Sequence, residues 1–171
     1  MPETSGLPIH LHQLQQVVAE TVDEQAVLRA AADAAGRCIG HKLCTFMRFD
    51  ADAMEVQRVF STDPVAYPPG GRKKKRHTAW GQQVLLDGHP YIGRCADDIR
   101  RNFDDHELIE RLGLRSMLNM PLRIAGRTLG TMNLSHEEAF YSDEHLLPAG
   151  LITGLVAAWF VQSAPPAGRL P

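Results

Sequence analysis

Apolar residues recur at helical spacing at both ends of the chain. Over residues 9–22 they lie three or four positions apart, which predicts a helix with one apolar side. A second helical segment follows; the two fit one bent helix or two separate helices, with Thr21 and Glu24 as a candidate capping box. Near the end, every fourth position is apolar, which predicts a last helix with a core-facing side. The apolar positions are Leu11, Leu14, Val18 and Val22 in the first helix, and Leu147, Leu151, Leu155 and Trp159 in the last.

Two pairs of strand-like segments lie between these helices. Segments 43–49 and 54–61 are rich in strand formers and flank a run of turn residues, as in a β-hairpin. Segments 115–123 and 127–136 form a second hairpin around the tight turn at 124–126. The pattern predicts an α+β fold, in which an antiparallel sheet is flanked by helices.

A long connection joins the two hairpins. It holds about fifty residues, more than a linker requires, and excursions of this length in compact domains usually serve function. Pro and Gly residues make 63–71 a loop, and short helices are predicted over 78–86 and 104–112, with a short strand at 91–93 between them. We expect the functional site here.

The second hairpin has one apolar and one polar face, because successive side chains of a strand point to opposite sides. The polar face carries amides and hydroxyls and no charge, which suits an enclosed cavity better than open water. A plain solvent-facing surface is the alternative. The residues of this face are Met117, Asn119, Thr131, Asn133 and Ser135.

Side chains of the long connection are candidates for the opposite wall of such a cavity. Aromatic rings can pack on a flat ligand and keep a polar tip available. Arg94 could hold a carboxylate or phosphate, or pair at the surface with Asp97 or Asp98. Simple packing is the alternative for the others. The candidates are Trp80, Tyr91, Arg94, Cys95 and His106.

Several of these segments resemble the GAF family. Gly113 to Leu122 resembles its Gly-hydrophobic-x-Ser stretch ending in Pro-Leu, 129–134 its next strand, and 140–147 the start of its final helix. The resemblance runs from about Asp23 to Phe160 and implies an α/β sandwich related to PAS domains. Terminal helices would cover one face of the sheet, and short helices and loops would cover a ligand pocket on the other. It also implies a homodimer through the terminal helices, with 1–22 as a dimerisation helix and 23–163 as the GAF domain. Residues 164–171 are rich in Pro and Gly, and we expect a flexible tail there.

The motifs of specialised GAF subfamilies are incomplete in this sequence. The cyclic-nucleotide motif is broken, because Asn133 is followed by Leu134 and only two residues separate Phe140 from Asp143. Members that reduce free methionine sulfoxide need several cysteines near the pocket, whereas the middle segment has only Cys95. A Cys-His pair for bilin attachment is missing there as well. We therefore expect a non-enzymatic sensory domain that binds a small molecule and acts through a partner chain. The alternatives are a free methionine-(R)-sulfoxide reductase-like enzyme and a ligand-free dimerisation scaffold.

Composition narrows the function further. The 171 residues are 44% hydrophobic and 22% charged, as in a soluble globular domain, and the net charge of −2 does not favour nucleic acid. Five adjacent cations, Arg72 to Arg76, could contact phosphates, but we expect a solvated loop.

Three cysteines without a Cys-x-x-Cys pair indicate neither a disulfide framework nor a zinc site. We identify no cofactor and no catalytic motif, and without a secretory signal or an apolar run long enough to cross a bilayer we expect a cytoplasmic protein.

Overall fold

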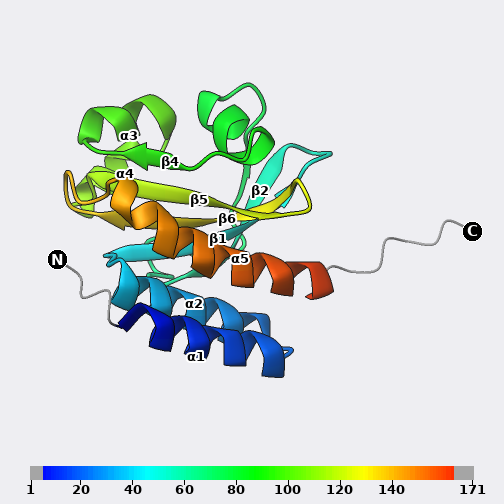
Figure 1. Ribbon diagram of the computed structural model, residues 1–171. Helices are drawn as coiled ribbons and strands as arrows, with labels where there is room; N and C mark the ends of the chain where they lie inside the picture. The colour runs from blue at the N-terminus through cyan, green and yellow to red at the C-terminus, as the bar shows by residue number, and fades with distance from the viewer. Residues whose placement is uncertain (1–5, 164–171) are drawn as a thin grey trace, which may run out of the picture.

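The protein is built on one antiparallel sheet, with helices on both faces (Figure 1). The computed structural model describes residues 6–163, so the predicted flexible tail lies outside the described residues. The strand order is β3-β2-β1-β6-β5-β4, which places the two predicted hairpins side by side at its centre. The strands are β1 (Leu43–Asp50), β2 (Glu55–Ser61), β3 (Arg72–Lys74), β4 (Tyr91–Gly93), β5 (Ser116–Ile124) and β6 (Arg127–His136). The predicted α+β class is confirmed.

Three long helices, α1 (Leu7–Glu20), α2 (Glu24–Cys38) and α5 (Leu146–Ser163), lie on one side of the sheet, where α2 and α5 contact the strands and α1 packs against α2 and α5 (Figure 1). The main hydrophobic core lies between them and the strands. The first two are separate helices. The carboxylate of Asp23 caps α2 by accepting a hydrogen bond from the backbone amide of Gln25 at 2.9 Å. The predicted capping box is therefore wrong, because the Thr21 hydroxyl instead accepts from the backbone amide of Asp23.

The last helix buries only part of the predicted side, since Trp159 is buried and Leu155 packs on the core, whereas Leu147 and Leu151 do not. Leu147 and Leu151 are 69% and 43% exposed, and the buried side is formed by Ala149, Ile152, Val156 and Phe160. Because α5 is apolar around most of its circumference, spacing alone could not choose between its apolar stripes. The segment Asp143–Gln162 is long and apolar enough to cross a membrane. Because this helix contributes to the core of the domain, its length and composition are weak evidence for a membrane span.

The connection between the hairpins covers the other face of the sheet (Figure 1). It contains β3, a single π-helical turn η2 (Gly81–Leu86), β4, and the helices α3 (Ala96–Asn102) and α4 (His106–Arg111). Two smaller apolar clusters join this layer to the sheet. The short 3-10 turn η3 (Asp143–His145) then leads into α5.

The basic run is an edge strand and not the solvated loop that we expected. Strand β3 pairs antiparallel with β2, with Lys73 opposite Val56 and Lys74 opposite Glu55. Side chains of a strand alternate between its two faces. Lys73 and Lys75 are therefore turned toward the domain interior, while Arg72 and Lys74 are exposed.

Candidate functional site

A cavity of about 60 Å³ lies between the sheet and the connecting layer. Its floor comes from β1, β5 and β6, its side from β2 and β3, and its roof from the segment between Tyr67 and Ile109. The lining residues are Leu43, Thr45, Met47, Arg58, Tyr67, Lys73, Lys75, Trp80, Phe103, Asp105, Ile109, Met117, Asn119, Asn133 and Ser135.

The floor consists of two cross-strand rows that the sheet register aligns. Leu43, Ser135 and Met117 form one row, because Ser135 pairs with both of the others. Thr45, Asn133 and Asn119 form the next row in the same way. Rows two residues apart on each strand share a face, so these six side chains point toward the connecting layer.

A chain of hydrogen bonds links the floor to the roof. The Trp80 indole Nε1 donates to Asn119 Oδ1 at 2.9 Å, and Asn119 Nδ2 donates to Asn133 Oδ1 at 3.0 Å. Asn133 Nδ2 in turn donates to the hydroxyls of Thr131 and Thr45, at 3.1 and 3.3 Å. Trp80 and Asn119 are only 3% and 2% exposed. This chain fixes the orientation of both amides, so that each presents a defined donor or acceptor to the cavity.

Two buried cations stand at the side of the cavity. Lys75 and Arg58 are each 8% exposed. The Lys75 ammonium lies 5.1 Å from the ring centre of Trp80, and burial, aided by the nearby Lys73, lowers the pKa of Lys75. The Arg58 guanidinium lies 4.8 Å from the ring centre of Tyr67 and donates to the Pro68 carbonyl at 3.1 Å. Burial also lowers the pKa of Arg58. This wall gives the cavity a positive character.

One carboxylate, Asp105, reaches the same region. Its Oδ1 atom forms an ion pair with Lys73 Nζ at 3.0 Å, and its Oδ2 atom accepts a hydrogen bond from the Tyr67 hydroxyl at 3.2 Å. Burial alone would raise the pKa of Asp105, but the hydrogen bond and charge of Lys73 outweigh it, so this pKa is lowered. Burial and the adjacent Asp105 raise the pKa of Tyr67. At neutral pH the carboxylate is ionised and already paired.

Of the site residues predicted from the sequence, Trp80, Met117, Asn119 and Asn133 line this cavity. Tyr91 and Thr131 lie next to it without lining it. The Tyr91 ring packs edge-to-face on Phe103 at 6.0 Å, and its hydroxyl donates to the Asp98 carbonyl. Thr131 is fully buried and accepts the hydrogen bond from Asn133.

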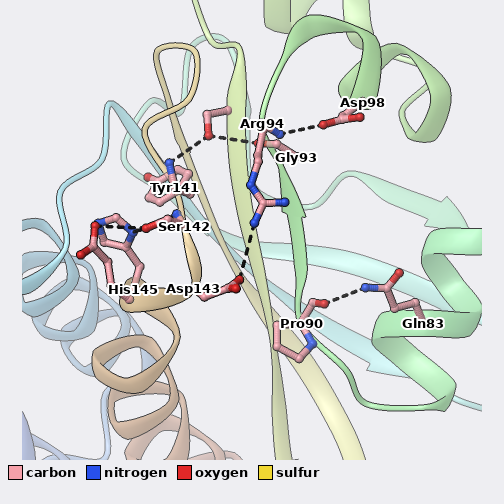
Figure 2. A network of polar contacts seen from close by, with 11 residues as sticks. Gln83, Pro90, Gly93, Arg94, Asp98, Tyr141, Ser142, Asp143 and His145 are labelled. Atoms are coloured by element: carbon pink, nitrogen blue, oxygen red, sulfur yellow. Dashed lines mark hydrogen bonds and ion pairs between the residues drawn. The ribbon is translucent and has the colours of Figure 1, made fainter.

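Arg94, Cys95 and His106 lie elsewhere. The Arg94 side chain is exposed at the edge of the sheet, where it reaches Asp143 at 3.5 Å (Figure 2). The backbone amide of Arg94, and not its side chain, donates a hydrogen bond to the Asp98 carboxylate at 2.9 Å. Cys95 precedes α3 as its N-cap residue, and His106 lines a shallow hollow beside Ile99 and Glu110. Short-range spacing could not reveal these positions, because Arg94 and Cys95 follow the edge strand β4 and His106 begins α4, outside the cavity.

The sequence interpretation missed the charged half of the site. In a run of five cations, every position is basic, so the alternation that sends Lys73 and Lys75 inward is invisible. The alternation of Leu43, Thr45 and Met47 on β1 could have placed these residues, as it did for the second hairpin.

None of the three cysteines lines the cavity. Cys44 is completely buried, and burial raises its pKa, as it does less strongly for the half-buried Cys38. A thiol of raised pKa is a poor nucleophile, because the thiolate is the reactive form.

Comparison with known proteins places the chain in a family. A family model described as a GAF domain matches residues 21–159. The chain belongs to the GAF domain family. No curated protein matches its sequence.

Solved GAF domains share the whole architecture at low identity. The GAF domain of a phosphoenolpyruvate-protein phosphotransferase from Coxiella burnetii has a TM-score of 0.78 at 17% identity, over 94% of this chain and 95% of its own. A free methionine-R-sulfoxide reductase from Neisseria meningitidis, in complex with its substrate, gives 0.72 at 22% identity, over 92% and 89%. The A. aeolicus nlh2 GAF domain in an inactive state gives 0.69 at 14% identity, over 92% and 97%. At these identities the comparisons show the fold, which occurs in sensory domains and in at least one reductase.

Proposed function

We propose that this GAF domain is a non-enzymatic sensor that binds a small molecule in the cavity beneath η2 and signals through a partner protein. GAF domains are generally sensory or regulatory ligand-binding domains in signalling proteins. The observation that carries the proposal is the polar floor of the cavity. Asn119 and Asn133 are oriented by neighbouring side chains and face a space enclosed on several sides. Enclosed sites with a few oriented polar groups are typical of ligand pockets.

Placement of the thiols supports a sensor over a reductase. A reductase would need an accessible, low-pKa cysteine beside its substrate. Here the cavity lining contains no sulfur nucleophile, and Cys44 is buried in the main core. We also propose a cytoplasmic location, since the fold is that of soluble signalling domains.

The outer side of α5 is the surface on which we propose that two copies pair. The apolar stripes that the sequence suggested for pairing are largely used inside the domain, where Leu14 and Trp159 are buried. Leu147, Leu151 and Val161 remain exposed on α5. An apolar helix side of this kind can bury itself against its own symmetry mate.

Native mass spectrometry of the purified protein, followed by denaturation to release any bound molecule, tests the sensor proposal. The same measurement on Ser135→Leu provides a blocked cavity, because Ser135 lies at the centre of the floor between Leu43 and Met117. Ser135→Ala is the matched control, since it removes the hydroxyl without adding volume.

We expect a bound molecule in the wild type and in Ser135→Ala, and its loss in Ser135→Leu. If the wild type binds no small molecule after purification or after exposure to a metabolite mixture, the ligand-free scaffold replaces the sensor. Activity toward methionine sulfoxide that disappears in Cys95→Ser would establish the reductase instead.

A further inference from the structure

We propose that the ligand of this cavity is a small oxyanion, a carboxylate or phosphate of about four to six non-hydrogen atoms, bound by the ammonium of Lys75 and the guanidinium of Arg58. The inference rests on the proposed function, since it names the chemical class that the sensor recognises. It concerns the charged wall of the cavity, which no GAF motif in the sequence indicated.

The charges around the cavity do not balance. Three cations line it, against the single carboxylate of Asp105. Asp105 is already engaged by Lys73 and by the Tyr67 hydroxyl. The charge of Asp105 acts on both Arg58 and Lys75, but within residues 6–163 neither of these buried cations forms a direct ion pair with a carboxylate. A buried charge is costly unless it is paired, and an anion in the cavity would supply that pair.

Both cations have unused hydrogen-bonding capacity. The Lys75 ammonium makes no hydrogen bond or ion pair within residues 6–163, where its contacts are the rings of Trp80 and Phe103 at 5.1 and 5.9 Å. The Nε atom of Arg58 is buried and has no hydrogen-bond partner in the same part of the chain. An oxyanion accepts several such bonds at once, and guanidinium and ammonium groups are its usual partners.

The position of Lys75 is fixed by its backbone. Its amide donates to the Met54 carbonyl at 2.8 Å, and its own carbonyl accepts from the Thr78 hydroxyl at 3.0 Å. Gly81, at the start of η2, lies so close that a Cβ there would stand 2.4 Å from the Lys75 carbonyl oxygen. Strand β3 and η2 thus hold this residue in place before a ligand arrives, which lowers the entropic cost of binding.

The size of the cavity limits the anion. A volume of 60 Å³ accommodates about four to six water-sized groups, the size of acetate, pyruvate or phosphate. Asn119 has one amide hydrogen that is not used in the chain to Asn133, and it can bond a carbonyl or hydroxyl oxygen of the ligand. A small hydroxy or keto acid would use both the charged wall and the polar floor.

Isothermal titration calorimetry in a zwitterionic buffer of constant ionic strength tests this assignment. The probes are acetate, pyruvate and phosphate, each against the wild type, with acetamide and methyl pyruvate as neutral counterparts of the two carboxylates. We expect at least one anion to bind with 1:1 stoichiometry, and a carboxylate that binds to do so about tenfold or more tightly than its neutral counterpart. Binding of the carboxylates alone, or of phosphate alone, decides between the two sources of negative charge.

A pair of variants on one strand assigns the binding to the cavity. Lys75→Met removes the buried charge and keeps the length of the side chain, whereas Lys74→Met removes an exposed charge from the other face of β3. We expect Lys75→Met to weaken anion binding by about tenfold or more and Lys74→Met to leave it within about twofold, after circular dichroism has established that both are folded.

Equal effects of the two variants, or equal binding of an anion and its neutral counterpart, would overturn the proposal. Failure of all three anions to bind the wild type would also overturn it. A third outcome is that a neutral molecule binds, that Ser135→Leu abolishes this binding and that Lys75→Met leaves it unchanged. The cavity would then be a site for a different class of ligand. The sensor function would then stand without this inference. The comparison of each carboxylate with its neutral counterpart uses the wild type alone, so the proposal can still be tested if Lys75→Met does not fold.

Discussion

The hydrogen bond from Trp80 to Asn119 offers the sharpest test of how the cavity is built. Asn119→Leu keeps the approximate volume of the side chain and removes the acceptor of the indole N–H. Trp80 is 3% exposed and makes this bond at 2.9 Å, so loss of the oxygen leaves a buried donor. An unsatisfied buried donor costs about 1–3 kcal/mol.

The second bond of Asn119 adds less to the expected loss. Its partner, Asn133 Oδ1, faces the cavity and can turn to water, so this bond contributes only about 0.5–1.5 kcal/mol. We therefore expect Asn119→Leu to lower the free energy of unfolding by about 1.5–4.5 kcal/mol in total. Gln16→Leu, on the exposed side of α1, is the control and should stay within about 0.5 kcal/mol.

A double-mutant cycle isolates the bond itself. Trp80→Phe removes the indole N–H and keeps an aromatic ring, and the double variant lacks both partners. Because neither partner is left unsatisfied in the double variant, its loss should fall short of the sum of the single losses by about 0.5–3 kcal/mol. Urea unfolding followed by far-UV circular dichroism is the suitable assay, since changing a tryptophan would distort a fluorescence signal. Additive losses, or an Asn119→Leu loss below about 0.5 kcal/mol, would show that the bond does not support the fold.

Three further predictions concern other parts of the domain. Gly130→Ala should destabilise the protein by more than about 3 kcal/mol in urea unfolding, because its Cβ would stand 2.0 Å from the Met47 carbonyl oxygen. The control Gly154→Ala, where nothing lies within 4 Å, should be neutral or stabilising. Asp105→Asn should cost about 1.5–3 kcal/mol at pH 7 by removing the charged partner of Lys73. Since the folded pKa of Asp105 lies below its ordinary 3.8, this stability is present above that pH and is lost as the pH falls through the lower folded value. The wild type and Asp105→Asn should therefore converge in acid unfolding curves; a constant difference would contradict the assignment. Leu151→Glu should convert the proposed dimer to a monomer, as measured by light scattering at about 50 µM, a concentration at which a standard interface holds. If the wild type is already monomeric at this concentration, α5 is not a pairing surface.

Local periodicity by itself determined the two central hairpins of the sheet and the part of the polar floor that β5 and β6 supply. The alternation over 115–136 put Met117, Asn119, Asn133 and Ser135 on one face, and this is where they line the cavity. Such a prediction works because the two-residue period of a strand is a property of the backbone and needs no knowledge of neighbouring elements. The turn between β5 and β6 is local in the same sense, since Ala125 and Gly126 adopt the positive φ values of a tight hairpin.

Tertiary packing decided which of several equivalent faces each element buries. Helix α5 is apolar on most sides, and only its contact with β5, α1 and α2 selects Ile152 and Val156 over Leu147 and Leu151. The same holds for the basic run Arg72 to Arg76. Each of its five positions is a cation, so only the pairing with β2 decides that Lys73 and Lys75 face the interior. A uniform stretch of sequence has no period of its own. The direction of its side chains, and with it the charge of the cavity, is set by the neighbours against which the stretch packs.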